Sequence, residues 1–268
     1  MRLLIRCLVL ALSGCVSSFT WLPAQAAAPP TLLQAPLERA DVTIPFWWMP
    51  HDAPRATLVL LIGGTRGGVG DDLAALAAHP NFLTRSRELF HKAGFSVAIV
   101  GRASDRTGLD HAYRKSFEHS RDIRAVLLRL KELAPKDIWL VGTSLGTISA
   151  ANAAISSPDL VAGLALTASY GNPESPNKVQ SLELRNIRMP TLVLHHRRDA
   201  CRGCPPDGAK DIVSDLASAR HKELIFISGG SGASGDPCGP LHYHGFINQE
   251  EEAVVHIASW IRAHGQRP

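Results

Sequence analysis

Residues 136–150 read KDIWLVGTSLGTISA, and this stretch decides the fold that the sequence predicts. The apolar run KDIWLV is typical of a buried parallel strand, and the alanine- and serine-rich segment after residue 146 is typical of a helix packed closely on a sheet. Between them lies GTSLG, residues 142–146. The pattern G-x-S-x-G between a strand and a helix predicts a turn so tight that its flanking positions must lack side chains. Such a turn lifts the Ser144 hydroxyl off the carboxyl edge of the sheet, where a serine nucleophile is needed.

Apolar runs and helical patterns alternate on both sides of this turn. The runs expected to be strands are residues 42–48, 56–62, 95–100, 136–141, 160–166, 191–195 and 222–228. Helical spacing appears at residues 82–93, at 123–133 and after Asn248, which with Glu251 resembles a capping box. Pro45 suggests that the first strand lies at an edge. The alternation predicts a parallel sheet sandwiched by helices in a single domain, residues 38–268, after an irregular N-terminal segment at 27–37.

The composition fits one globular domain with a sizeable core. Of the 268 residues, 45% are hydrophobic and 19% are charged, which excludes a disordered chain. The formal net charge is +4, and loss of Arg2 and Arg6 with a targeting segment leaves 26 basic against 24 acidic side chains, too small an excess to favour nucleic acid as a partner. The glycine-rich segment 63–70 lacks the Lys-Ser/Thr ending of a P-loop. We therefore expect no nucleotide and no other cofactor.

Residues 1–26 have the pattern of a signal peptide. Arg2 and Arg6 precede an apolar core that begins with CLVLAL, and AQA at 24–26 is a small-x-small cleavage site. A competing site, LSGC at 12–15, resembles the lipobox at which bacterial lipoproteins are cut and acylated on the cysteine. We favour cleavage after residue 26, because residues 16–21 are more apolar than the usual lipoprotein tether. The expected location is periplasmic or secreted, with a membrane-anchored lipoprotein through Cys15 as the alternative, and no later stretch predicts a membrane span.

Two later residues could activate the serine. A serine hydroxyl is a poor nucleophile at neutral pH and needs a base, usually histidine, that is held by a carboxylate. Asp199 follows the run TLVLHHRR, and His244 lies in the loop after KELIFIS. Both positions follow predicted strands, so both side chains are expected beside Ser144 at the carboxyl edge of the sheet.

From about residue 42 to residue 261 the chain resembles α/β-hydrolases of the dienelactone-hydrolase-like and prolyl-oligopeptidase-like kind, especially exported bacterial members. The matching features are GTSLG, the strand-acid segment TLVLHHRRD, and HGF at 244–246 ahead of a helix that ends in SWI. The order Ser144, Asp199, His244 is also the order of that fold. The resemblance implies an α/β fold with a mostly parallel central sheet and helices on both faces. It also implies Ser144 as nucleophile, His244 as base and Asp199 as orienting acid.

The same resemblance implies an oxyanion hole. Its first donor carries over to the backbone N–H of Leu145, and its second to the N–H of Gly64 or of Thr65. Many relatives have a His-Gly pair where this chain has two glycines at 63–64, so the second donor stays open. Only 54 residues separate the proposed nucleophile from the proposed acid, so no large cap domain is expected, and any cover would come from residues 169–188 or 63–78.

Rival residues lie near the predicted base and acid. His242 could take the base role, but the histidine that is followed by glycine, His244, is the one that the motif places at the serine. Asp236 is a weaker candidate for the acid than the residue after the strand. His195 and His196 lie at a strand end and are expected to pack or to support the site rather than to bind a metal.

After export the chain keeps Cys201, Cys204 and Cys238, which in an oxidising compartment suggests one disulfide and one spare thiol. Cys201 lies two residues after the proposed acid and Cys238 six before the proposed base. If both loops meet at the serine, these two cysteines come close, so we predict a disulfide between them. A zinc site from the three cysteines and His242 is a less favoured alternative, as is a redox pair in CRGC at 201–204.

The sequence thus predicts a serine hydrolase that works through an acyl-enzyme, acting on a carboxylic ester and needing no metal. Peptidase or acyltransferase activity would use the same triad and differ in leaving group or acceptor, which the sequence does not show. A second class also stays open. Because a fold does not fix a function, the chain could be a non-catalytic binding protein on the same fold.

Overall fold

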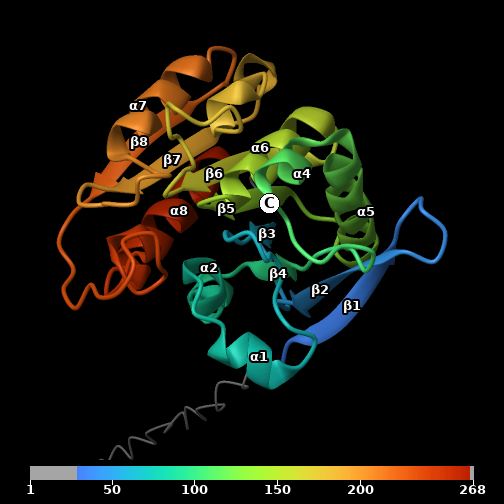
Figure 1. The fold of residues 1–268 in the computed structure, drawn as a ribbon. Helices are drawn as coiled ribbons and strands as arrows, with labels where there is room; N and C mark the ends of the chain where they lie inside the picture. The colour runs from blue at the N-terminus through green and yellow to red at the C-terminus, as the bar shows by residue number, and fades with distance from the viewer. Residues whose placement is uncertain (1–28, 266–268) are drawn as a thin grey trace, which may run out of the picture.

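The computed structural model describes residues 29–265, so the predicted signal peptide and lipobox lie outside the described residues. The chain forms an eight-stranded sheet with the order β1-β2-β4-β3-β5-β6-β7-β8 (Figure 1). The strands are β1 (Thr31–Pro36), β2 (Thr43–Met49), β3 (Thr57–Leu61), β4 (Ser96–Val100), β5 (Ile138–Thr143), β6 (Val161–Thr167), β7 (Thr191–His196) and β8 (Lys222–Ile227). The pairs β1–β2 and β2–β4 are antiparallel. All other neighbouring pairs, from β4–β3 to β7–β8, are parallel. The predicted mostly parallel sheet is confirmed.

The N-terminal edge of the sheet differs from the prediction. Residues 27–37 are not irregular throughout, because Thr31–Pro36 form the edge strand β1, paired along its whole length with β2. Pro29 and Pro30 before it and Pro36 at its end hide this strand in the sequence, and it is stabilised by pairing with β2 and by burial of Ala35 in the core. Pro45 does not mark an edge either, since β2 lies between β1 and β4. It stands one residue before the first β2–β4 pair, at Phe46, and its carbonyl accepts a hydrogen bond from Gly101 N–H at 2.9 Å.

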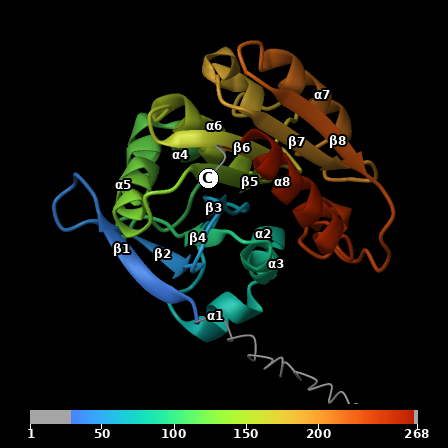
Figure 2. The same cartoon turned by 180° about the vertical axis from the view of Figure 1, so that it is seen from behind.

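Helices cover both faces of the sheet (Figures 1 and 2). On one face, a buried apolar core is shared with α5 (Phe117–Leu133), α6 (Gly146–Ser156) and α7 (Pro206–Asp215). On the other face, a second core is shared with α1 (Leu73–Ala78), α2 (Phe82–Arg85), α3 (Arg87–Lys92) and α8 (Glu250–His264). Side chains of β3 alternate between the two cores, with Val59 in the first and Leu58 and Leu60 in the second. Burial on both faces explains why this strand is a continuous apolar run.

The helices follow from the sequence with local exceptions. In α5 the buried side chains Ile123, Val126, Leu127 and Leu130 recur at the spacing that predicts one helical face. The predicted helix at 82–93 is divided at Ser86 into α2 and α3. The last helix, α8, begins at Glu250 rather than after Asn248, which has a left-handed φ of 55° and donates to Ser231. These differences move no predicted site residue.

The sheet places three chain segments at one edge. β5 leads into the GTSLG turn, β7 leads to Asp199, and the loop after β8 carries His244 in the short helix η3 (Tyr243–Gly245). These strands run in parallel, so their carboxyl ends meet at the same edge, as in other open α/β sheets. Within residues 29–265, no helix has the length and apolarity needed to cross a bilayer.

Candidate active site

The GTSLG turn is the tight turn that its glycines predict. Ser144 has a φ of 53°, a left-handed conformation that costs energy for a residue with a side chain. A Cβ on Gly146 would lie 1.9 Å from the Leu61 carbonyl oxygen, and one on Gly142 would lie 2.6 Å from the Gly146 oxygen. Neither position tolerates a side chain. Because α6 starts at Gly146, the serine stands at the N-terminus of that helix, where partial positive charge favours an anion.

His244 and Asp199 form a buried pair. The distance from His244 Nδ1 to Asp199 Oδ2 is 2.9 Å, and both side chains are nearly inaccessible to solvent. The other carboxylate oxygen of Asp199 accepts the N–H of Cys201 at 2.9 Å. With Nδ1 bonded to the acid, His244 keeps Nε2 for proton transfer, which is the arrangement that a serine base requires.

Ser144 and His244 line the same cavity, of about 200 Å³. The Ser144 hydroxyl lies 3.9 Å from Cys204 Sγ, and the described residues contain no hydrogen bond between Ser144 and His244. Serine–histidine hydrogen bonds in unliganded enzymes are commonly long and tighten when substrate binds. The structure therefore places Ser144, His244 and Asp199 close together, but within the described residues the hydrogen bond between Ser144 and His244 is not formed.

Within residues 29–265, Asp236 and His242, the alternative candidates for acid and base, do not contact the three predicted site residues through hydrogen bonds. Asp236 is exposed and accepts the N–H of Cys238 within its own loop. The His242 ring meets Tyr243 edge to face, and its Nδ1 has no hydrogen-bond partner among the described residues. Neither residue forms a hydrogen bond with Ser144, Asp199 or His244 in the described part of the chain, which favours the predicted base and acid over their rivals.

His195 is a second partner of the acid. Its Nε2 lies 3.2 Å from Asp199 Oδ2 and 3.0 Å from the Cys204 carbonyl oxygen. Both neighbours are acceptors, so the proton belongs on Nε2. Burial of Asp199 favours its neutral form, but the hydrogen bonds from His195 and His244 outweigh this effect and lower the pKa of Asp199 from 3.8 to about 2. The acid is therefore ionised wherever a serine hydrolase would work.

Acid should destabilise the fold through Asp199. Because its pKa is lower in the folded chain than in the unfolded chain, the ionised carboxylate stabilises the fold above about pH 4, and this contribution is lost as the pH falls from about 4 towards 2. We expect the parent to lose about 1 kcal/mol more free energy of unfolding between pH 6 and pH 3 than Asp199→Asn does. Urea unfolding of both proteins measures this, and equal pH dependence would contradict it.

The glycine segment predicted to supply the second oxyanion donor begins beside the serine. A Cβ on Gly63 would lie 2.7 Å from Ser144 Cβ, and Gly63 and Gly64 line the same cavity as Ser144. The N–H groups of Leu145, Gly64 and Thr65 donate no hydrogen bond within residues 29–265. The predicted oxyanion hole therefore stays a prediction, and the choice between Gly64 and Thr65 depends on how their peptide groups are held.

The predicted disulfide between Cys201 and Cys238 is present, with an S–S distance of 2.01 Å. It joins the acid loop to the histidine loop across 37 residues, and closing a loop of that length stabilises a fold by about 4 kcal/mol in the chain-entropy model. Cys204 is the free thiol, and burial raises its pKa far above the usual range. Sulfur atoms of Cys201 and Cys204 and a ring nitrogen of His244 lie within 4.8 Å of one another, but a bridged Cys201 is not a thiolate ligand. The disulfide therefore removes two sulfurs from the zinc alternative.

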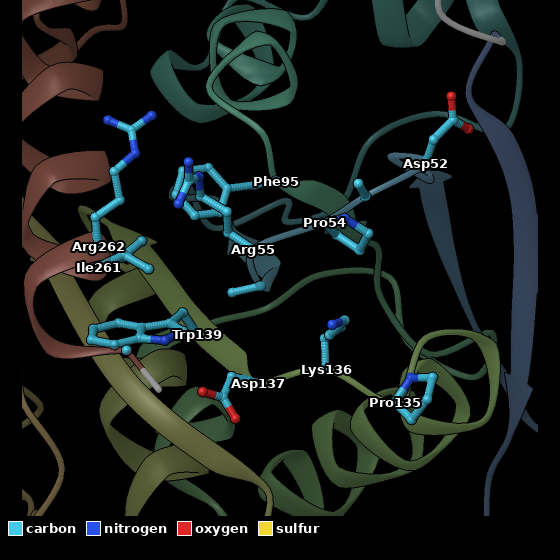
Figure 3. A pocket seen from close by; sticks show the side chains of 13 residues that line it. Asp52, Pro54, Arg55, Phe95, Pro135, Lys136, Asp137, Trp139, Ile261 and Arg262 are labelled. Carbon is cyan, nitrogen blue, oxygen red and sulfur yellow. The ribbon is translucent and has the colours of Figure 1, made fainter. Parts of the chain in front are cut away.

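A larger hollow, of about 760 Å³, lies away from these residues (Figure 3). Trp139, Arg55 and Arg262 are among the residues that line it. Trp139 is the second residue of β5, whereas Ser144 follows the last residue of that strand. The hollow thus lies at the amino end of the parallel strands, and ligands of open α/β sheets bind at the carboxyl end. Size alone does not identify the site.

Comparisons with known proteins extend this description. No protein-family model and no curated protein matches the chain. An esterase from Pyrococcus furiosus is structurally similar, with a TM-score of 0.62, 16% identity, and coverage of 88% of this chain and 92% of the esterase. An α/β serine hydrolase without a lid from Xanthomonas campestris has a TM-score of 0.61 and 15% identity, and the match covers 89% of this chain and 96% of that hydrolase. The chain has the α/β-hydrolase fold. A dienelactone hydrolase from Anabaena variabilis is similar in fold as well, with a TM-score of 0.60, 12% identity, and coverage of 89% of this chain and 100% of that hydrolase.

Within this α/β-hydrolase fold, His195 supports the site as the sequence predicts, because it donates to Asp199. Two other residues near the site, Cys204 and Arg114, are not predicted to contact it. Cys204 faces the serine, and no sequence pattern indicates this. Arg114 donates to the Gly64 carbonyl from 50 residues away, and such a contact depends on tertiary structure alone.

Proposed function

We propose that this protein is a serine hydrolase that cleaves carboxylic esters through an acyl-enzyme on Ser144. The observation that carries the proposal is the left-handed Ser144 turn in one cavity with a buried His244–Asp199 pair. Strain at a polar residue is kept where function needs it. The names of the structural neighbours, which include esterases, agree with this reaction class.

The proposed reaction has two halves. Ser144 Oγ attacks the ester carbonyl carbon while its proton passes to His244 Nε2, and the negative charge on the carbonyl oxygen is stabilised by the Leu145 N–H and by that of Gly64 or Thr65. The tetrahedral intermediate collapses, the C–O bond to the alcohol breaks, and the alcohol leaves with the proton from His244. Water then attacks the acyl-enzyme with His244 again as base, and the acid and the free serine are released.

The cavity favours small acyl groups. It measures about 200 Å³, and Pro80, Phe82 and Pro240 contribute apolar walls. Residues 79–82, at the start of α2, line it, so the nearest cover comes from the segment after β3 rather than from a cap between β6 and β7. Peptidase or acyltransferase chemistry would use the same residues, but a peptide or a second large acceptor would need an extended groove. A short ester is therefore the proposed substrate class.

The proposed location is outside the cytoplasm. The predicted signal peptide at residues 1–26 and a structural disulfide agree with an oxidising compartment. Processing after residue 26 and acylation on Cys15 would give different mature masses, so the intact mass of the exported protein separates the two alternatives.

Turnover of a p-nitrophenyl ester series tests the proposed function. We expect kcat/KM to be highest for acetate to butyrate and to fall at least about tenfold by decanoate, because a longer chain exceeds the cavity. A fluorophosphonate probe should add one adduct to the intact protein. A well-folded protein that neither turns over these esters nor takes up the probe would instead support the non-catalytic binding alternative, while cleavage of amides alone would support the peptidase alternative.

A further inference from the structure

Arg114 is a buried cation without a carboxylate partner. It lies in α4 (His111–Lys115), is 1% exposed, and forms no ion pair with any residue of the described chain. Burial lowers its pKa from 12.5 to about 10, so the guanidinium keeps its charge at neutral pH. A charge without an ion-pair partner is costly to bury unless hydrogen bonds satisfy its donors.

Two of the acceptors of the Arg114 guanidinium lie in or directly before the glycine segment beside the serine. Nη2 donates to the Gly64 carbonyl at 2.9 Å and to the Ile62 carbonyl at 3.2 Å. Nε donates to the Leu109 carbonyl at 3.1 Å, and Leu109 N–H in turn donates to the Thr65 carbonyl at 2.7 Å. The backbone oxygens of residues 62, 64 and 65 are therefore fixed by one arginine and the residue that it holds.

The contact with Gly64 bears on one amide in particular. The Gly64 carbonyl and the Thr65 N–H belong to the same planar, trans peptide group, so they point in opposite directions. A hydrogen bond from a guanidinium to that oxygen fixes the plane of the peptide and polarises its N–H. Gly64 itself has a φ of 83°, and an added Cβ would meet open space, so the chain turns here without a packing constraint from a side chain. Arg114 supplies the constraint that the turn lacks.

Arg114 is also tied to the helix that carries the serine. Nη1 donates to Ser149 Oγ at 2.8 Å, and His119 Nε2 lies 2.9 Å from the same oxygen. Burial, together with the charge of Arg114, lowers the pKa of His119 to about 3, so its imidazole is neutral and can accept the Ser149 hydroxyl proton. Asn152 of α6 donates to the Arg114 carbonyl at 3.0 Å. The arginine therefore couples the nucleophile helix to the glycine segment.

We propose that Arg114 is a positioning residue for the oxyanion hole: it orients and polarises the Gly64–Thr65 peptide, which makes Thr65 N–H the second donor. This inference rests on the proposed hydrolase function. The substrate oxygen becomes negative in the transition state. The buried guanidinium behind the donor stabilises this negative charge without reorganisation. Substrate binding, in which the oxygen is still neutral, gains much less.

Arg114→Met tests the proposal. We expect kcat per active site to fall by about 30- to 100-fold with KM within about threefold of the parent, as when a group acts on the transition state alone. Affinity for a trifluoromethyl ketone, which forms an anionic adduct with the serine, should fall by the same factor as kcat/KM. Arg114→Lys keeps the positive charge but not the forked set of donors, so its kcat per active site should lie between those of the parent and Arg114→Met. Burst titration counts active sites, so a purely structural role would lower the burst amplitude and leave kcat per site unchanged.

Arg102→Met is the matched control. Arg102 also donates to carbonyls of the glycine segment, those of Arg66 and Gly67, but not to the peptide before Thr65. Its kcat should stay within about threefold of the parent.

If both Arg114 variants fail to fold, Ser149→Ala replaces them, with an expected threefold to tenfold loss of kcat and no change in KM. Unchanged kcat per site in the folded variants overturns the proposal alone, whereas a parent without acyl-enzyme overturns the proposed function and this inference together.

Discussion

Replacing Ser144 by alanine should lower ester turnover by about 10⁵-fold and abolish labelling by a fluorophosphonate. The change removes the only atom that would form the acyl bond, so nothing in the cavity can take its place: the nearby Cys204 thiol is buried, and its raised pKa keeps it protonated. The backbone of residue 144 stays left-handed, because the sheet and helix around it impose that turn. The loss should therefore be one of chemistry and not of folding.

Intact mass after probe treatment measures the Ser144 effect, and the melting temperature of Ser144→Ala should lie within a few degrees of the parent. Ser157→Ala is the matched control, since Ser157 is a buried serine at the far end of the same helix whose hydroxyl has no hydrogen-bond partner among the described residues. It should keep full labelling. Full residual turnover in a folded Ser144→Ala protein would remove the proposed function.

His244→Ala should have the second largest effect, a loss of about 10⁴-fold or more in kcat. Without the imidazole, Ser144 loses its proposed base, and the buried Asp199 carboxylate keeps only the His195 ring and the Cys201 N–H as hydrogen-bond donors among the described residues. Free imidazole should restore part of the activity, because it can enter the space that the missing ring leaves and accept the serine proton. A stopped assay of p-nitrophenyl acetate with and without imidazole measures both effects.

His242→Ala separates the two histidines that the sequence leaves in competition. Its ring packs on Tyr243 and does not reach the acid, so its loss should change kcat by less than about tenfold. A loss as large as that of His244→Ala would mean that the base was assigned to the wrong residue, while a small loss in both variants would point to another proton acceptor altogether.

Much of the fold is readable from the sequence because local and global signals agree. The run ATLVLLI is apolar throughout since β3 is covered on both faces, and the spacing in α5 matches the face that it buries. The GTSLG pattern predicts the tight turn, because both flanking positions must lack side chains. Burial pattern and residue size at these positions are visible in a short stretch of sequence, which is why sequence patterns indicate them.

Other features depend on distant parts of the chain. β1 forms because β2 lies beside it, and the prolines before it and at its end, Pro29, Pro30 and Pro36, give no local sign of a strand. The contact of Arg114 with Gly64 joins residues 50 apart, so nothing near either residue indicates it. The Cys201–Cys238 disulfide could be predicted only after the fold had placed both loops at the serine. Long-range contacts of this kind require the assembled sheet.

The disulfide also changes what a break in the chain would do. Residues 228–242 contain no helix or strand and are largely exposed, which makes this loop a favoured target of a protease. A cut between residues 229 and 237 would separate His244 and α8 from the rest of the backbone, yet Cys238 would still hold that fragment to Cys201. The nicked protein would keep its two pieces, and with them the proposed base His244, covalently joined until a reductant broke the disulfide.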